Sequence, residues 1–376
     1  MVRKINQSFV YGVSVGGDNF TDRVKETKRL KMDFENGLNV VLISPRRMGK
    51  TSLVKKVCQV VDPQLVHTVY IDIYDCRSEY DFYNRFATEL LKQTSSHLEQ
   101  AMENVKRFLV RLAPKISFGN KLTGEYSLSL GISPKNYSPE ELLSLPEKLA
   151  AHIGRHIVVC IDEFQQVGSW PDGLSVQKRM RGIWQHQEGV SYCLFGSRQH
   201  MMTQLFQDKR MPFYQFGEPN YLQPIPVQDW TPFIIHKFEE KGLTIDADQV
   251  RCICERVDCQ SSYVQQLSWN VMINTDDVVT DEIVQQGLED LLAQCTPLFM
   301  EQTATLTTYQ LNFLRAVASG LSSEFTAVSN MEQYNLGTKS NVVKVKKTLI
   351  EKDFVSETDA GVVISDPVMA MWLQSR

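Results

Sequence analysis

Residues 40–52 read VVLISPRRMGKTS, and this stretch decides the fold. The first four residues are apolar and mostly β-branched, and the turn signal Asn36-Gly37 precedes them, which predicts a short buried strand of a parallel sheet. A loop is expected over residues 44–49 and a helix over residues 50–61. A strand, a loop and a helix in this order are the context in which a phosphate-binding loop works.

The loop fits the pattern GxxxxGK[ST] except at its first position, where Ser44 replaces glycine. In such loops the backbone N–H groups converge on the β-phosphate, and the helix N-terminus adds partial positive charge. Gly49 lets the backbone approach, Lys50 reaches the β- and γ-phosphate oxygens, and the Thr51 hydroxyl coordinates Mg²⁺. The alternative is a chance match in a strand–turn–helix connection. The predicted nucleotide contacts are Ser44, Pro45, Arg46, Arg47, Met48, Gly49, Lys50, Thr51 and Ser52.

A second apolar strand, over residues 157–161, ends in two carboxylates, Asp162 and Glu163. Asp162 suits water-mediated contact with Mg²⁺, and Glu163 suits polarising a water for attack on the γ-phosphate. The alternative is an ordinary solvated strand end, where polar residues gather in any case. Both motifs stand in the right order on the right elements, so the sequence predicts that the chain binds ATP with Mg²⁺.

A third strand end, after residues 191–195, carries Gly196-Ser197-Arg198. Either Ser197 or Arg198 could sense the γ-phosphate. Arg198 is favoured, because a guanidinium stabilises the charge on a transferring phosphoryl group; the alternative is a surface arginine. Arg46 and Arg47 could face the phosphates or a neighbouring subunit.

Strands alternate with helices along the first part of the chain. Strands are expected over residues 40–43, 66–73, 157–161 and 191–195, with a fifth over 220–225, which predicts an α/β fold: a parallel P-loop sheet with helices on both faces. Residues 112–139 resemble a β-hairpin inserted into this core.

The pattern becomes helical from about residue 226, with helices expected over 229–241, 247–257, 261–274 and 281–303. Two further helices and two short strands end the chain, which is typical of a winged helix. The expected domains are therefore a P-loop ATPase core over 1–225, a helical lid over 226–303 and a winged helix over 304–376.

Composition excludes several classes of protein. A chain of 376 residues is too long for one ordinary hydrophobic core, so two or three domains are expected. A net charge of −4 argues against a uniformly basic nucleic-acid binder. No apolar run approaches the ~20 residues that span a bilayer, and the N-terminus lacks a signal-peptide apolar region. The spacing of Cys252, Cys254 and Cys259 fits no common zinc pattern, so a reduced, cytoplasmic protein is expected.

The stretches FVYG, LISPRRMGKTSLV, VVCIDEFQQV, LFGSRQHM, YVQQLSW and ISDPVMAMWL together resemble the archaeal-type ATPase group of the STAND branch of P-loop NTPases, which is related to AAA+ proteins. The resemblance spans nearly the whole chain, and SPRRxGKTS is the usual loop of that group. It implies a switch in which ATP or ADP sets the arrangement of core, lid and winged helix.

Carried over by residue, the resemblance places Lys50 and Thr51 on phosphate and Mg²⁺, and Asp162 and Glu163 in the acidic site. It makes Arg198 a sensor and puts Phe9, Tyr11 and Arg23 near the base. One stretch departs from the group: Gln260-Ser261-Ser262 stands where Gly-His-Pro or Gly-Asn-Pro usually precedes the lid tyrosine, here Tyr263. This departure bears on nucleotide sensing by the lid and leaves the phosphate loop unchanged.

Three functions remain open from the sequence. The first is a STAND-like ATPase acting as a regulatory switch, with ATP or ADP as ligand and a protein partner or a second copy as its target. The second is a nucleic-acid-binding regulator that acts through residues 338–352. The third is a nucleotide-binding protein without turnover. The nucleic-acid hypothesis rests on the charge of residues 338–352, because lysines on a helix can neutralise phosphates. This stretch has one acid, Glu351, and five lysines: Lys339, Lys344, Lys346, Lys347 and Lys352.

Overall fold

A computed structural model describes residues 7–94 and 138–376. The predicted hairpin over residues 112–139 lies almost entirely outside them. By its contacts the chain divides into two units, each described by itself. The sheet unit comprises Arg23–Arg46 and Lys50–Leu222, and the helical unit comprises Met1–Asp22, Arg47–Gly49 and Gln223–Arg376. The three-way division into core, lid and winged helix stays a prediction.

In the described residues the sheet unit is built on five parallel strands in the order β2-β3-β4-β1-β5, which confirms the predicted α/β class. The central strands β1, β3 and β4 are buried, except for the half-buried His156 at the start of β3, because helices cover both faces. The strands are β1 (Val40–Ile43), β2 (Val66–Asp72), β3 (His156–Asp162), β4 (Val190–Gly196) and β5 (Glu218–Tyr221).

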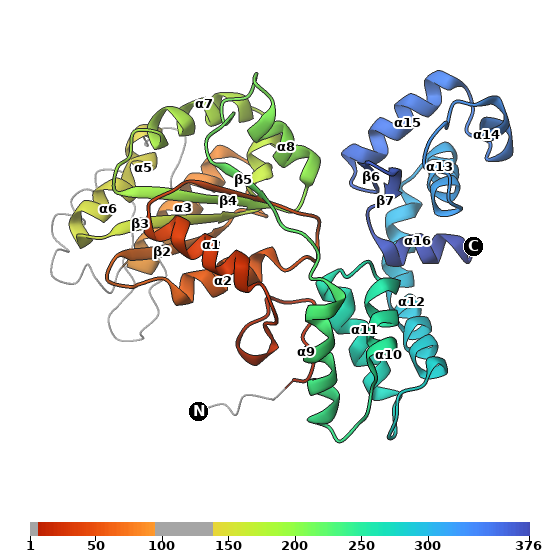
Figure 1. Cartoon of the computed structure of the whole chain (residues 1–376). Helices are drawn as coiled ribbons and strands as arrows, with labels where there is room; N and C mark the ends of the chain where they lie inside the picture. Colours follow the sequence, from red (N-terminus) through yellow and green to blue (C-terminus); the bar gives the residue numbers. More distant parts are fainter. Residues whose placement is uncertain (1–6, 95–137) are drawn as a thin grey trace, which may run out of the picture. The chain divides into compact units, whose positions relative to one another are not determined.

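Helices form one layer on each face of the sheet, as Figure 1 shows. Alternate residues of a strand point to opposite layers. Val41 and Ile43 join a large apolar cluster on one face, and α2 packs on the other, where Cys58 Sγ lies 3.9 Å from Cys160 Sγ. The first layer contains α3 (Glu79–Thr94), α5 (Pro139–Leu143), α6 (Leu145–Ile153), η3 (Phe164–Ser169), α7 (Gly173–Trp184) and α8 (Gln199–Gln207). The second contains α1 (Val24–Glu35) and α2 (Lys50–Val60).

The edge strand β5 lies earlier than predicted. The prediction over residues 220–225 followed the apolar Leu222 and Ile225, which are buried but lie after the strand. The strand itself is mostly exposed, and among the described strands β1 is its one partner. Its entry depends on Gly217, where a Cβ would lie 2.8 Å from the Asn39 carbonyl oxygen. Backbone approach, rather than apolar pattern, places this strand.

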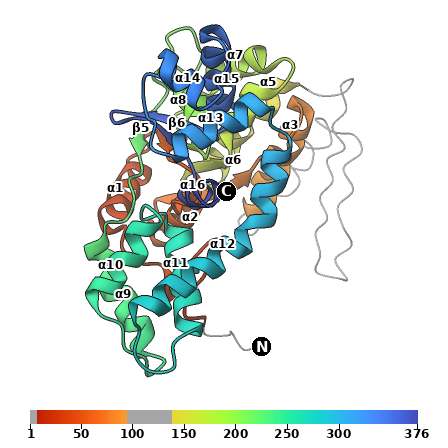
Figure 2. The same cartoon turned by 90° about the vertical axis from the view of Figure 1, so that its right-hand side faces the viewer.

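The helical unit begins with the short η1 (Gly17–Asn19) and continues with four long helices. Phe9 is buried in its core, with ring centroids 6.2 and 6.1 Å from Phe233 and Phe238. Gly287 lets two helices approach closely, since a Cβ there would lie 2.8 Å from Val271 Cγ2. Figure 2 shows α12, the longest helix among the described residues, running from α11 to α13 (Thr308–Ala318). The four are α9 (Val227–Glu239), α10 (Ala247–Arg256), α11 (Ser261–Ile273) and α12 (Asp281–Ala304).

The last part of the helical unit is a winged helix, as predicted. Its wing is an antiparallel pair in which Val355 lies opposite Ile364. Trp372 and Leu373 are buried, so the apolar end of the chain belongs to the core. No helix in residues 7–94 and 138–376 has the length and apolarity needed to cross a membrane. The elements are α13 (Thr308–Ala318), α14 (Val328–Gln333), α15 (Lys339–Glu351), β6 (Val355–Thr358), β7 (Gly361–Ile364) and α16 (Pro367–Gln374).

Candidate nucleotide-binding site

The loop between β1 and α2 holds a buried lysine. Lys50 is the first residue of α2, and its Nζ donates to the Ser44 carbonyl oxygen at 2.9 Å, to Ser44 Oγ at 3.2 Å and to the Pro45 carbonyl oxygen at 2.7 Å. Gly49 has a φ of 82°, in the left-handed region that favours glycine. The loop therefore curls around the ammonium group that the sequence assigns to phosphate.

Burial lowers the pKa of Lys50 from its ordinary value to about 8. The carboxylates of Glu163 and Asp162 oppose this shift, while the Arg46 guanidinium adds to it. A buried lysine of this kind gains from an anionic partner, because a phosphate restores the charged form. The pKa of Lys50 is thus coupled to any phosphate bound beside it.

We expect nucleotide affinity to fall as pH rises above about 8. The free protein loses the Lys50 proton there, whereas phosphate favours the protonated amine, so binding takes up a proton. The Kd should then rise by up to about tenfold per pH unit. A fluorescent-nucleotide titration between pH 7 and 10 measures it. Lys50→Arg is the control, because a guanidinium stays charged over that range. A parent Kd that is flat above pH 8 would contradict the coupling.

Asp162, the last residue of β3, joins that strand to α2. Thr51 Oγ1 donates to Asp162 Oδ2 at 2.7 Å, and the Glu163 backbone N–H donates to Asp162 Oδ1 at 2.8 Å. Asp162 is buried, with an exposed fraction of 5%. Burial raises the pKa of Asp162, and the hydroxyl hydrogen bonds from Thr51 and Tyr70 oppose that shift. The structure therefore brings together the two residues predicted to hold Mg²⁺.

Glu163 is held by two side chains. Its φ of 55° is unusual for a residue other than glycine, and residues in such conformations cluster at functional sites. Glu163 Oε2 accepts hydrogen bonds from Gln165 Nε2 and, at 3.0 Å, from Ser197 Oγ. Gly196 makes room for this arrangement, since a Cβ there would lie 1.8 Å from Gln165 Oε1. The sequence had not identified Gln165.

Ser197 and Arg198, the two candidates for sensing the γ-phosphate, contact different residues. Ser197 contacts Glu163, whereas Arg198 Nη1 donates to Met201 Sδ at 3.8 Å. The sequence favoured Arg198 on charge alone. Ser197 directly follows β4, and β4 pairs with β3, so its short side chain can hydrogen-bond to Glu163 at the end of β3. The sensor role of Arg198 stays a prediction.

The donor set around Thr51 and Asp162 fits Mg²⁺. A hydroxyl and a carboxylate are oxygen ligands, and Mg²⁺ usually keeps several waters and takes further oxygens from substrate phosphates. Within residues 7–94 and 138–376 no group of three or more His, Cys, Asp or Glu side chains could hold a metal ion. A metal here would consequently depend on phosphate and water oxygens, as Mg²⁺ in nucleotide sites does.

Comparison with known proteins agrees with this geometry. A Walker-type ATPase of Pyrococcus abyssi aligns with a TM-score of 0.71 at 18% identity, covering 98% of this chain and 100% of that one. The chain has the fold of a Walker-type ATPase. The Aeropyrum pernix ORC2 protein, solved as ADPNP–ADP complexes, aligns with a TM-score of 0.57 at 14% identity, covering 94% and 95% of the two chains.

The end of the chain gives a separate match. Residues 297–375 match the family described as "Probable winged helix domain". This range contains α13 to α16 and the β6–β7 wing, and so confirms the predicted winged helix. Among curated proteins no match was found.

Arg47, in the middle of the loop, belongs by its contacts to the helical unit of the Walker-type fold. Its guanidinium pairs with Asp366 and lies 4.4 Å from the Tyr263 ring centroid. Its carbonyl oxygen accepts from the Ser262 backbone N–H at 3.1 Å. Tyr263 Oη donates to Asp366 Oδ2 at 2.8 Å, which closes a three-residue cluster. This cluster could not be predicted from the sequence, because 319 positions separate Arg47 from Asp366.

The residues expected near the base lie in both units. Phe9 is packed in the helical unit, where the neighbouring Val10 backbone N–H donates to Gln265 Oε1 at 2.8 Å. Tyr11 is exposed. Arg23 is buried in the sheet unit and pairs with Glu26 at 2.8 Å. Their contact with a base stays a prediction.

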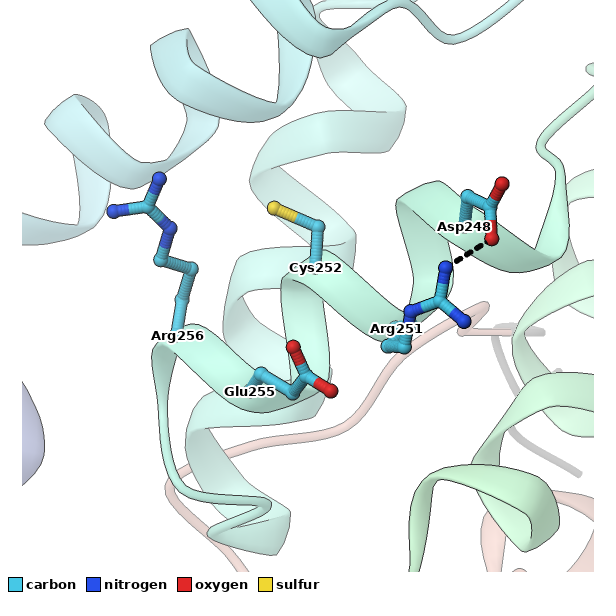
Figure 3. Close-up of a pocket in the computed structure, with 5 residues that line it drawn as sticks. All are labelled: Asp248, Arg251, Cys252, Glu255 and Arg256. Carbon is cyan, nitrogen blue, oxygen red and sulfur yellow. Dashed lines mark hydrogen bonds and ion pairs between the residues drawn. The ribbon is translucent and has the colours of Figure 1, made fainter.

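A hollow of about 380 Å³ lies elsewhere, along α10. Arg251 pairs with Asp248 within the same helix, as Figure 3 shows. None of the residues lining it belongs to the loop over 44–52 or to β3, so we assign it no part in nucleotide binding. Its lining residues are Asp248, Arg251, Cys252, Glu255 and Arg256.

Proposed function

We propose that this chain is a Mg²⁺-dependent ATPase that acts as a nucleotide-operated regulatory switch. The observation that carries the proposal is the 2.7 Å hydrogen bond between Thr51 and Asp162, which joins the start of α2 to the end of β3. Buried Lys50 directly precedes Thr51, and Glu163 directly follows Asp162. These are the groups that phosphoryl transfer to water needs in one place.

In the proposed reaction the loop N–H groups and Lys50 hold the β- and γ-phosphates, and Thr51 and Asp162 hold the metal. Bound Mg²⁺ would neutralise charge on the phosphate oxygens. Glu163 accepts a proton from a water whose oxygen attacks the γ-phosphorus, while the bond from phosphorus to the ADP oxygen breaks. Gln165 and Ser197 would orient the Glu163 carboxylate toward that water.

Arg47 supports the switch part of the proposal. Its guanidinium pairs with Asp366, and Asp366 Oδ1 also caps α16 by accepting from the backbone N–H groups of Val368 and Met369 at 3.0 and 3.1 Å. A phosphate bound in the loop would compete with Asp366 for the guanidinium. Nucleotide would then change what holds the first turn of α16, and so the state of the winged helix.

Limited proteolysis tests the switch. Ala304, the last residue of α12, and Thr305, which follows it, are exposed. We expect cleavage over residues 302–308 to differ by a factor of about 5 or more between ADP and a non-hydrolysable ATP analogue, the effect of roughly 1 kcal/mol on local opening. The same digest of Lys50→Ala should show no nucleotide effect. Equal cleavage rates for the parent without nucleotide, with ADP and with the analogue would rule out a switch of this kind.

A nucleic-acid regulator is the second candidate, favoured by α15. Lys339, Lys344 and Lys347 are exposed there, as is Lys352 directly after it, although Lys346 pairs with Glu357 and Lys347 with Glu351. Exposed lysines on a helix can neutralise phosphates, and binding through them would weaken steeply with salt. A salt series of DNA shift assays decides this candidate. A turnover assay separates the ATPase from the third candidate, a protein that binds nucleotide without hydrolysis.

A further inference from the structure

We infer that Tyr70 is a positioning residue for the metal-holding carboxylate, an inference that rests on the proposed function. Tyr70 Oη donates to Asp162 Oδ2 at 2.8 Å. The same oxygen accepts from Thr51 Oγ1 at 2.7 Å. Hydrogen bonds from α2 and from β2 thus fix the orientation of the Asp162 carboxylate.

The hydrogen-bonding capacity of Asp162 supports this role. A carboxylate has about four lone-pair positions, and Oδ2 uses two of them on Tyr70 and Thr51. Oδ1 uses a third on the Glu163 backbone N–H. One position on Oδ1 remains for a metal-bound water. The Thr51 oxygen can ligate Mg²⁺ while its hydrogen stays on Asp162, so metal binding need not disturb Tyr70.

Tyr70 itself is held rigidly. In the sheet it lies opposite Cys160 of β3, and its ring centroid is 6.3 Å from that of Phe195. Lys55 Nζ lies 4.8 Å from the centre of the ring, a cation–π contact from α2. Burial, together with Asp162, raises the pKa of Tyr70, so the phenol keeps the proton that it donates.

The charges around Asp162 make this donor useful. Glu163 beside it and Asp72 on β2 both raise its pKa, and Lys50 on α2 faces it with the opposite charge. Like charges repel, so a buried carboxylate beside two other acids needs neutral donors such as the Tyr70 hydroxyl to fix its orientation. Residues that orient metal ligands from behind typically change metal affinity by 10–100-fold when removed.

The test is Tyr70→Phe, which keeps the ring against Phe195 and Lys55 and removes only the hydroxyl. We expect the Mn²⁺ concentration at half-saturation to rise about tenfold, measured by Mn²⁺ electron paramagnetic resonance with a non-hydrolysable ATP analogue. Nucleotide affinity in EDTA should stay within about twofold of the parent value, because Asp162 contributes through the metal. At saturating metal, kcat should also remain close to that of the parent.

Tyr192→Phe is the matched control. Tyr192 is a buried tyrosine of β4 whose Oη donates to Gln187 Oε1 at 2.6 Å, and its loss should leave the metal dependence unchanged. In an Asp162→Asn background, Tyr70→Phe should have little further effect on metal affinity if it acts through Asp162. The same half-saturation in parent and Tyr70→Phe overturns the inference alone. No metal-dependent nucleotide binding by the parent overturns the proposed function and the inference with it.

Discussion

Lys50→Ala should lose nucleotide binding. Its ammonium is buried in the loop and faces the position assigned to the β- and γ-phosphates, where truncating a buried charge typically costs roughly 2–5 kcal/mol, a factor of about 30 or more in Kd. The fold should persist, because burial disfavours the charged amine and alanine suits the first turn of α2. A fluorescent-nucleotide titration measures the loss, and circular dichroism checks the fold.

Lys56→Ala is the matched control for this variant. Lys56 lies on the same helix, is half-buried, and has no assigned part in the site. It should bind nucleotide like the parent. If Lys50→Ala bound as tightly as Lys56→Ala, the assignment of the loop over residues 44–52 to phosphate would be wrong.

Glu163→Gln should keep ATP bound and lower turnover by roughly 10²-fold or more, the effect of removing a general base. The amide can still receive hydrogen bonds from Gln165 and Ser197, so the local structure should survive. Phosphate release under saturating ATP measures turnover, and the fluorescent titration measures binding.

Two further variants define what that loss means. Glu188→Gln changes an exposed carboxylate of the sheet unit and should hydrolyse ATP like the parent. Asp162→Asn should instead weaken the Mg²⁺ dependence. Hydrolysis by Glu163→Gln at the parent's rate would exclude Glu163 as the residue that polarises water.

The parts of the fold with a strong local signal could be predicted from the sequence. β1 was predicted residue for residue, because a short β-branched run between a turn and a loop has few other structures available. The ends of β3 and β4 followed for the same reason. Parallel strands present their carboxyl ends at one edge of the sheet, which is why the sequence predicts Asp162 and Ser197 near the loop.

Four helices of the sheet unit could not be predicted from the sequence. No helix was predicted where α5, α6, α7 and α8 lie. Pro146 lies at the start of α6, where proline is tolerated, and Gly182 lies inside α7, where glycine lowers the intrinsic preference for a helix. Packing against the sheet, rather than intrinsic preference, holds such segments in helices.

The supporting residues of the site could not be predicted either, since their roles depend on register. Tyr70 reads as one more aromatic in a strand, and only the pairing of β2 with β3 places its hydroxyl on Asp162. Gln165 reads as a polar residue after an acidic strand end. Because the backbone of Glu163 is left-handed, the side-chain amide of Gln165 can donate to the Glu163 carboxylate.

The most direct test is an experimental structure of the protein with Mg²⁺ and a non-hydrolysable ATP analogue. We expect the β-phosphate within hydrogen-bond distance of Lys50 Nζ and of the backbone N–H groups of the loop. We also expect Mg²⁺ bound to Thr51 Oγ1, with Asp162 reached through a water. Nucleotide bound away from residues 44–52, or none at a saturating concentration, would contradict the proposed site.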